Sequence, residues 1–534
     1  MARVAPLLLR ALLELRQHGS AAQRTAREPL LENAIGTAAS IIVDAAATDG
    51  LVVAGDSFGV LLSVWNAGAD SVRVTSAGLE APSGWQVVSA GGAADDAFRG
   101  PFTTTSGVRS LRYTVTPGAD APLSEPYFLV RPLIGDLYDW SGAPDSLKDE
   151  PLDPPLLTAR VTLEVAGVPV TLRREVSWRY NDQATGEVRK PIFVVPAVGV
   201  SVSPGVLVWP VGSDSARAVT VELTHGARGR TEGEVRLELP GGWPDGEAQH
   251  FALEGQGTRR SFTFPVRVPR GLRPGPYEIH AVAESGGRRY ERASVIVDYP
   301  HIRPIAHTTS ATVRVEAAPI ALPPLARVGY VRGAADQVPE ALSAVGVPIT
   351  VLGPEDLERG DLSRYDAIVI GSRAYETDPA LVENNGRLLD YARGGGRLIV
   401  QYQQYPFIRG NFAPFPVRIA QPHDRVTDET APVRLLDPAN PVFRTPNAIG
   451  TGDWDGWVQE RGLYFLRQWD PAFRPLLEMG DNGEQLQGGL LVARLGRGVY
   501  VYTGLSFFRQ LPAGVPGAYR LFVNLLGLQP SAVP

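Results

Sequence analysis

The feature that most constrains the fold is a change of sequence pattern along the 534-residue chain. From Leu51 to about residue 300, short alternating runs rich in β-branched and aromatic residues are separated by Gly and Pro, which is typical of β-sandwich modules. From Ala326 to Leu528, apolar strands such as Ile368-Val369-Ile370 alternate with helical patterns. The second pattern predicts a parallel sheet with helices on both faces.

We therefore predict a multidomain β plus α/β protein, because a chain of this length is expected to form several domains. The predicted segments are a short helical segment at 1–48, a β-sandwich (immunoglobulin-like) module at 49–192 with an insertion at 131–157, a second such module at 193–300, a linker at 301–325 with one strand-like run, and a doubly wound parallel α/β domain at 326–530. The helical segment either docks on the following domain or is the end of an upstream domain.

The two β modules share an order of signals that indicates an internal duplication. In each module a Leu-Glu-x-Pro run leads to a Gly-Trp pair, at Trp85 and at Trp243, and a Pro-Tyr pair follows at Tyr127 and at Tyr277. We expect strands at 126–130 and around Tyr277. We also expect both tryptophans to be mostly buried as core plugs, rather than exposed as platforms for sugar rings.

Charge and composition exclude several classes of function. The net charge is −6 and the basic residues are scattered, so the chain lacks the electrostatic footprint of a nucleic-acid-binding protein. The apolar run near the N-terminus is interrupted by Arg10 and Glu14, which is a poor match to a secretory signal, and no later stretch approaches the ~20 apolar residues of a membrane span. Localisation stays open between the cytoplasm and export with an upstream segment.

The C-terminal pattern resembles a known superfamily. The runs Arg364-Tyr-Asp-Ala-Ile-Val-Ile-Gly and Tyr391-Ala-Arg-Gly-Gly-Gly-Arg-Leu-Ile-Val resemble the class I glutamine amidotransferase-like superfamily, including its ThuA-like branch. That resemblance implies a nucleophilic cysteine directly after the second run and a late His-x-Glu. Here Gln401 follows the run, the chain contains no cysteine, and His423 is the only histidine of the domain. Thiolate chemistry is therefore excluded.

Candidate binding residues follow from the expected sheet, because ligands bind at the carboxyl ends of the strands in such folds. The candidates are Ser372, Arg373, Tyr375, Glu376, Gln401, Tyr402, Gln403, His423, Trp454 and Ser506. His423 with Asp424, Asp428 and Glu429 is a weak metal or acid/base cluster, since no second histidine lies at ligand spacing. Trp454, with Trp457, either stacks on a sugar or packs in the core. We expect no catalytic residue, no metal and no cofactor.

The order of the modules carries a wider resemblance. The second module, with Leu237-Glu-Leu-Pro-Gly-Gly-Trp and Gly275-Pro-Tyr, resembles the NPCBM-associated domain found beside bacterial glycosidases. The whole chain is similar to the C-terminal part of large bacterial PIG-L (LmbE-like) deacetylases, whose zinc motif of the His-Pro-Asp-Asp-Glu type is absent here. This implies a non-catalytic accessory region, with a deacetylase domain or chain and a carbohydrate or envelope polymer as partners. The alternatives are a hydrolase of unassigned chemistry in the C-terminal cleft and a structural scaffold that binds envelope polymers.

Overall fold

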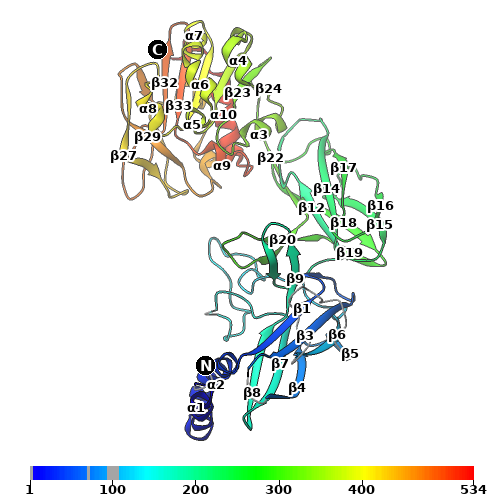
Figure 1. The fold of residues 1–534 in the computed structure, drawn as a ribbon. Coiled ribbons are helices and arrows are strands. Elements are labelled where there is room, and N and C mark those ends of the chain that lie inside the picture. The colour runs from blue at the N-terminus through cyan, green and yellow to red at the C-terminus, as the bar shows by residue number, and fades with distance from the viewer. Residues whose placement is uncertain (1–3, 69–71, 93–107, 149, 534) are drawn as a thin grey trace.

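The computed structural model describes residues 4–68, 72–92, 108–148 and 150–533, and it shows a multidomain, β-rich protein with sandwich-like sheets (Figure 1). A helical hairpin and a first sandwich lie at one end, a second sandwich follows, and a body with both helices and strands lies at the other end (Figure 1). Within the described residues, no helix is long and apolar enough to cross a membrane.

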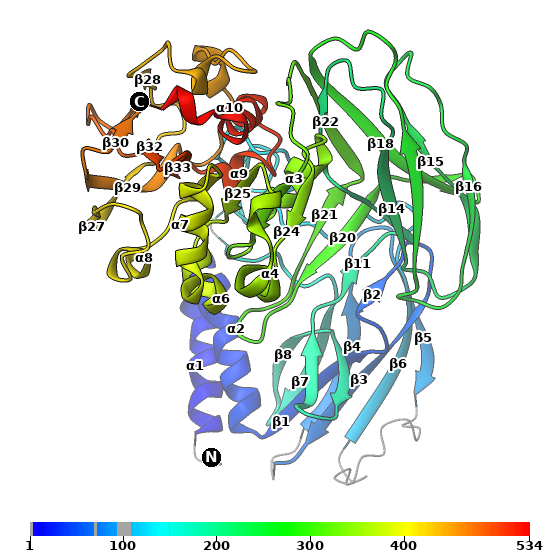
Figure 2. The ribbon, with the colours of Figure 1, turned by 90° about the horizontal axis from the view of Figure 1, so that it is seen from above.

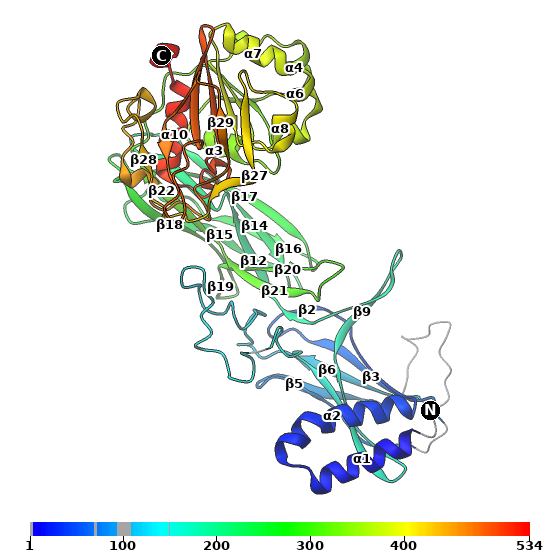
Figure 3. The same cartoon turned by 90° about the vertical axis from the view of Figure 1, so that its left-hand side faces the viewer.

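The N-terminal helices form a hairpin that packs on the first sandwich (Figure 3). They are α1 (Ala5–His18) and α2 (Ala21–Ala38). Leu12 and Ile35 are fully buried in the core of the sandwich, and the carboxylate of Glu32 accepts a hydrogen bond from the backbone N–H of Thr171 at 2.8 Å. The hairpin thus docks on the following domain, which is one of the two predicted alternatives.

The first sandwich begins earlier than the sequence suggested. Its strands are β1 (Ile41–Ala47), β2 (Leu51–Val52), β3 (Phe58–Asn66), β4 (Val72–Glu80), β5 (Gln86–Gly92), β6 (Val108–Thr116), β7 (Thr158–Val165), β8 (Val168–Glu175), β9 (Ser177–Asp182), β10 (Gly186–Lys190) and β11 (Phe193–Val194). A sheet of order β10-β9-β1-β3-β6-β5 is accompanied by a second sheet, β4-β7-β8. The predicted helical segment at 1–48 therefore ends at Ala38, because the β-branched residues at 41–43 start a strand that pairs with β3.

The connection between β6 and β7 also differs from the prediction. The run 126–130, expected as a strand, forms turns, and the insertion at 131–157 contains only an isolated β-bridge between Ile134 and Leu137 within its described residues. The aromatic rings of this segment contact one another, as Tyr127 and Trp140 do with ring centroids 6.1 Å apart. Local ring packing replaces strand pairing here.

The second sandwich includes part of the segment that we predicted to be a linker. Its strands are β12 (Val198–Ser203), β13 (Val206–Pro210), β14 (Arg217–His225), β15 (Thr231–Glu238), β16 (Gln249–Leu253), β17 (Arg259–Val266), β18 (Gly275–Ser285), β19 (Arg288–Tyr290), β20 (Arg292–Val297), β21 (Ile305–Ser310) and β22 (Thr312–Ala318). The sheets are β12-β14-β17 and β13-β22-β18-β15-β16, and β20 pairs with β21. Because β22 lies between β13 and β18 with Val313 and Val315 fully buried, residues 312–318 of the predicted linker are part of the sandwich.

The two predicted core tryptophans differ in burial. Trp243 is 5% exposed and meets Trp209 edge-on, with ring centroids 6.1 Å apart, so its predicted role as a core plug is confirmed. Trp85 is half-buried and packs edge-on against Phe58 at 6.4 Å. Neither ring forms the flat exposed platform of a sugar-binding face.

The C-terminal body is built on a seven-stranded sheet of order β24-β23-β25-β26-β33-β32-β30. Its strands are β23 (Val328–Val331), β24 (Ile349–Val351), β25 (Ala367–Ile370), β26 (Arg397–Gln401), β27 (Val417–Val426), β28 (Arg434–Leu435), β29 (Gly462–Trp469), β30 (Phe473–Pro475), β31 (Leu477–Glu478), β32 (Leu490–Leu495) and β33 (Gly498–Thr503). The first five strands of the sheet are parallel, whereas at one edge β32 pairs antiparallel with β33 and β30 pairs antiparallel with β32.

Helices cover both faces of this sheet. They are α3 (Val338–Ala344), α4 (Pro354–Arg359), α5 (Ala374–Thr377), α6 (Pro379–Glu383), α7 (Asn385–Arg393), α8 (Tyr405–Arg409), α9 (Phe507–Gln510) and α10 (Pro516–Gly527). Val369 lies in a core with α3 and α10, whereas its neighbours Ile368 and Ile370 lie in a second core with α4 to α7. Figure 2 shows α6 and α7 next to each other on the sheet. Successive side chains of β25 therefore point to opposite faces of the sheet, and each face is covered by an apolar layer.

Candidate ligand-binding site at the carboxyl ends of the parallel strands

The parallel strands bring most of the predicted residues to one edge of the sheet. In the ladder, Ile370 pairs with Val400, and Gln401 pairs with Thr503, so β25, β26 and β33 end side by side. Ser372 and Arg373 follow β25, the run 401–403 follows or ends β26, and Ser506 follows β33. This edge is therefore the place where their side chains can act together.

A buried polar chain forms the floor of this edge. Gln401 is fully buried, and its Nε2 donates to the hydroxyl of Tyr330 at 2.7 Å. Tyr330 in turn donates to Oδ2 of Asp336 at 2.7 Å. Burial, with a smaller contribution from the charge of Asp336, raises the pKa of Tyr330 well above its usual value, so the phenol keeps its proton. The other amide atom, Oε1 of Gln401, is buried without a partner in the described structure.

Tyr330 and Asp336 were missed by the sequence analysis. Tyr330 is the one polar side chain within the buried strand Val328–Val331, and that was the available signal. Asp336 also accepts hydrogen bonds from the backbone N–H groups of Gly333 (3.1 Å) and Val338 (3.0 Å), so it holds the loop after β23 against the sheet. Its role depends on contacts across the fold that no local pattern encodes.

Gln403 and Tyr375 build the loops rather than face a ligand. Nε2 of Gln403 donates to the carbonyl oxygens of Gly371 (2.8 Å) and Gln401 (3.0 Å), and its Oε1 accepts from the backbone N–H of Tyr375 at 3.2 Å. The hydroxyl of Tyr375 donates to Oδ1 of Asn385 at 2.6 Å. Both side chains have their hydrogen-bonding groups in use inside the protein.

Arg373 and Glu376 form an ion pair at the rim. Arg373 has a φ of 61°, in the left-handed region, and its backbone N–H donates to the carbonyl of Tyr402 at 3.1 Å. Its guanidinium donates to Oε2 of Glu376 at 2.9 Å, whereas Oε1 of Glu376 is buried and has no partner among the described residues. The same holds for the hydroxyl of Ser372, which is 2% exposed.

An aromatic stack brings His423 to this edge from a distant part of the sequence. The ring of His423, on β27, lies 3.7 Å from that of Tyr464 at an interplanar angle of 4°, and Tyr464 stacks on Tyr402 at 5.7 Å. Burial, followed by the nearby charge of Arg425, lowers the pKa of His423, so the imidazole is neutral at pH 7. Its Nε2 is buried with no partner in the described part of the chain.

The carboxylates near His423 do not gather around it. Asp424 pairs with Arg467, and Oδ1 of Asp428 accepts from the N–H and hydroxyl of Thr430. Across the residues that the structure describes, no group of three His, Asp or Glu side chains is placed to hold a metal ion. The metal or acid/base cluster considered from the sequence is therefore not assembled there.

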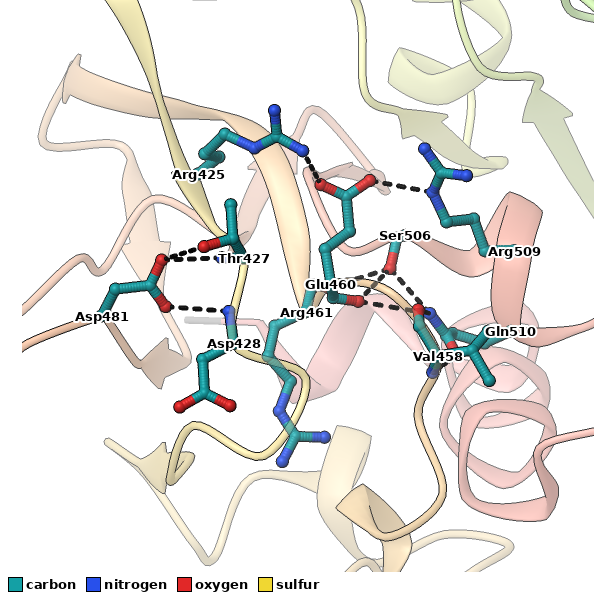
Figure 4. A network of polar contacts seen from close by, with 10 residues as sticks. All are labelled: Arg425, Thr427, Asp428, Val458, Glu460, Arg461, Asp481, Ser506, Arg509 and Gln510. Atoms are coloured by element: carbon teal, nitrogen blue, oxygen red, sulfur yellow. Dashed lines mark hydrogen bonds and ion pairs between the residues drawn. The ribbon is translucent and has the colours of Figure 1, made fainter. Parts of the chain in front are cut away.

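Ser506 lies in a closed network around Glu460 (Figure 4). Its hydroxyl donates to the carbonyl of Glu460 at 2.7 Å and accepts from Nε2 of Gln510 at 2.9 Å. The carboxylate of Glu460 is 1% exposed and lies between Arg425 (2.6 Å) and Arg509 (2.9 Å). Ser506 is fully buried, and its hydroxyl proton and one of its two lone pairs are used within this network, so these contacts give its nomination as a ligand-binding residue no support.

Trp454 is part of the core. It is 5% exposed, its ring centroid lies 5.2 Å from that of Trp457, and the guanidinium of the buried Arg461 lies 5.9 Å from it. Of the two predicted alternatives, sugar stacking and core packing, the structure has core packing.

The remaining residues define what we call the strand-end site. It consists of Ser372, Arg373, Glu376, Gln401, Tyr402, His423 and Tyr464. Four of its side-chain atoms are buried without a hydrogen-bond partner among the described residues: Ser372 Oγ, Glu376 Oε1, Gln401 Oε1 and His423 Nε2. Buried polar groups in folded proteins are nearly always paired, so four orphans at one sheet edge indicate that water or a ligand completes this site.

Comparison with known proteins assigns no family to the chain. No family model matches the chain, and no curated protein matches it. Solved structures with some likeness include a cold-adapted β-galactosidase from Rahnella sp. R3 (17% identity over 33% of this chain and 25% of that chain, TM-score 0.22) and a Salmonella α-2-macroglobulin mutant (10% identity over 53% and 16%, TM-score 0.19). The C-terminal domain of the Streptococcus pyogenes protein AspA is another (8% identity over 52% and 99%, TM-score 0.21). The chain spans a quarter or less of the first two, and scores this low assign neither family nor activity.

Proposed function

We propose that the chain is a non-catalytic recognition protein whose strand-end site binds a hydroxyl-rich ligand of the carbohydrate class. The observation that carries this proposal is the set of four unpartnered buried atoms at the ends of the strands. Left unsatisfied, each such atom costs roughly 1–3 kcal/mol of stability. A ligand that satisfies them therefore gains a specific binding contribution.

The chemistry of these atoms favours hydroxyl groups. Oε1 of Glu376 and Oε1 of Gln401 are acceptors, the hydroxyl of Ser372 donates and accepts, and Nε2 of neutral His423 does either, depending on its tautomer. Sugar hydroxyls are donors and acceptors at once. Ser372 and Gln401 are the deepest residues, at 2% and 0% exposure, so ordered water reaches them while ligand hydroxyls contact the partly exposed Glu376 and His423.

Recognition without turnover follows from the residues at the end of β26. The chain has no cysteine, and an amide such as that of Gln401 is a poor nucleophile and a poor base. The alternative of a hydrolase has less support, because the Ser506 hydroxyl is held inside the Glu460 network and no carboxylate touches His423 at hydrogen-bond distance in the described structure.

The resemblance found in the sequence supplies the setting for this proposal. Five parallel strands with helices on both faces support a doubly wound, glutamine amidotransferase-like C-terminal domain, with the two antiparallel strands as an addition at one edge. The second sandwich fits an NPCBM-associated-like role. We propose that the chain is an accessory part of a PIG-L (LmbE-like) N-acetylglucosaminide deacetylase system, with a deacetylase domain or chain and a carbohydrate or envelope polymer as partners.

A calorimetric titration with N-acetylglucosamine oligomers tests the proposal. Glu376→Ala removes one orphan acceptor and the partner of Arg373, and we expect it to weaken binding at least tenfold. The matched control is Glu383→Ala, since Glu383 is an exposed acid on the nearby α6. Binding that is equal in wild type and in both variants would place the ligand elsewhere, and no binding in the wild type would remove the proposed ligand class.

A further inference from the structure

A cavity, separate from the strand-end site, lies where the two sandwiches meet. It has a volume of about 310 Å³. Its walls include Ala54, Leu123 and Val195 from the first sandwich and its exit, and Arg288, Tyr290 and Arg292 from the second. This volume is at the lower end of the range of small-molecule sites, roughly 300–1,000 Å³.

A tight hairpin places the arginines at this junction. The strands β18 and β19 are joined at Gly286 and Gly287, both with φ in the left-handed region (56° and 75°), which suits glycine. The chain then passes directly from β19 into β20, so Arg288 and Arg292, at the starts of these two strands, line the same cavity. Figures 1 and 3 show β19 at the end of the second sandwich that faces the first.

The charges of the hairpin are only partly balanced. Arg289 donates to both carboxylate oxygens of Glu238, at 2.6 and 2.8 Å, and to Glu291 at 2.9 Å. This fork lowers the pKa of Glu238 to about 2. Arg288 and Arg292 are exposed and form no side-chain hydrogen bond or ion pair with any described residue. Arg289 and Glu291 also line the cavity and pair with each other, so among the described residues Arg288 and Arg292 are the guanidinium groups of its wall without an ion-pair partner.

Ion pairs tie the two sandwiches together. Lys190, from the first, pairs with Asp298, and Arg303 pairs with Glu175, with Nη1 of Arg303 2.9 Å from Oε2. A ligand at the junction would contact both modules at once. Binding there would thus also stabilise their mutual arrangement.

We propose that this junction cavity binds a small organic oxyanion, a carboxylate or a phosphate ester, between Arg288 and Arg292. Guanidinium groups recognise such anions through paired N–H donors. The apolar wall of Leu123 and Val195 supports the uncharged part of the ligand. The site is independent of the proposed sugar recognition at the strand ends, because it shares no residue with it.

Two probes that differ in one group test the charge requirement. D-Glucuronate carries a carboxylate, and D-glucose is its neutral counterpart of nearly the same shape. We expect calorimetry or ligand-observed NMR to detect D-glucuronate at this cavity, with binding weakened at least tenfold in the double variant Arg288→Gln/Arg292→Gln. Inorganic phosphate is added as a competitor: displacement of D-glucuronate assigns a general oxyanion site, and failure to displace it assigns a carboxylate site.

Controls separate this site from other positive charges. Arg270→Gln removes an exposed arginine of the same sandwich outside the cavity, and Glu376→Ala alters only the strand-end site. Both should leave D-glucuronate binding unchanged. The double variant should unfold at the wild-type temperature, since neither arginine bonds a described residue through its side chain. Equal loss of binding in Arg270→Gln, or D-glucose binding as tightly as D-glucuronate, would overturn the proposal.

Discussion

The side-chain amide of Gln401 donates to the hydroxyl of Tyr330 at 2.7 Å, at the position where the resemblance to amidotransferases implies a nucleophile. The hydroxyl uses its single proton to donate a hydrogen bond to Asp336. The end of β26 therefore carries a fixed donor that completes a buried hydrogen-bond chain. This relationship makes Gln401 a structural element of a recognition site rather than a reactive group.

Replacing Gln401 by glutamate should break this chain. A carboxylate has no proton to donate, and the proton of Tyr330 already goes to Asp336, so two oxygens would face each other in a buried site. We expect Gln401→Glu to lower the free energy of unfolding by about 2–4 kcal/mol at pH 8, measured by urea denaturation. The loss should shrink at lower pH, where a neutral glutamic acid donates. Gln404→Glu, at a half-buried neighbour, is the control, and wild-type stability of Gln401→Glu at pH 8 would contradict the network.

Because the backbone at Arg373 is left-handed, glycine should be more stabilising than alanine at this position, whereas alanine is usually the more stabilising of the two within a helix. Arg373→Gly and Arg373→Ala both lose the ion pair with Glu376, but only alanine keeps the Cβ that disfavours a φ of 61°. Arg373→Gly should be more stable than Arg373→Ala by about 1 kcal/mol. At Arg393, in helix α7, the order should reverse, with alanine the more stable. Thermal or chemical unfolding of the four variants measures these stabilities. The same stability order of glycine and alanine at both positions would contradict the prediction.

Ser506 should behave as a structural residue. Ser506→Ala removes the donor to the carbonyl of Glu460 and the acceptor for Gln510, which should cost about 1–2 kcal/mol of stability in urea denaturation. Binding of the sugar ligand should stay within a factor of about two of wild type, because the hydroxyl points into the Glu460 network. A large loss of binding in a variant that remains folded would return Ser506 to the site.

Glu238 should make stability depend on pH in acid. Its pKa is about 2 in the folded protein and 4.5 as its ordinary value, because Arg289 holds the carboxylate. The contribution is therefore complete above pH 4.5 and is lost as the pH falls through about 2. The pair is partly exposed, so Glu238→Gln should cost only up to about 1 kcal/mol at pH 7, and the difference from wild type should vanish near pH 2. Glu247→Gln, at an exposed acid, should show no such trend, and a cost for Glu238→Gln that persists at pH 2 would contradict the pairing.

Local sequence patterns predicted the five parallel strands of the C-terminal sheet, because each is a short apolar run bounded by turn residues, but they did not predict β30 and β32. The same patterns placed Ser372, Arg373 and Gln401 at one edge, since the carboxyl ends of parallel strands must meet. They did not place β22, whose strand-like run was noticed but whose partners, β13 and β18, lie far away in the sequence.

The site itself was only partly predictable for the same reason. The pairing of β27 with β29 brings Tyr464 next to the predicted His423, and a loop contact brings Asp336 to the hydrogen-bond chain beneath the site; neither contact leaves a local signature. Ser506 and Gln403 lie at the expected edge of the sheet. Their side chains, however, donate hydrogen bonds to backbone carbonyl groups inside the protein. The sequence pattern thus predicts where a side chain lies, whereas tertiary packing decides whether its polar atoms are free to bind a ligand.

The central claim, binding without turnover, is tested most directly by proton NMR on one sample of the purified chain with a chito-oligosaccharide and zinc. Saturation transfer from protein to sugar reports binding, and the acetate methyl signal reports deacetylation in the same tube. The account predicts saturation transfer that Glu376→Ala weakens and Glu383→Ala preserves, with no acetate released over days. Release of acetate by the wild-type chain, or the absence of saturation transfer, would contradict it.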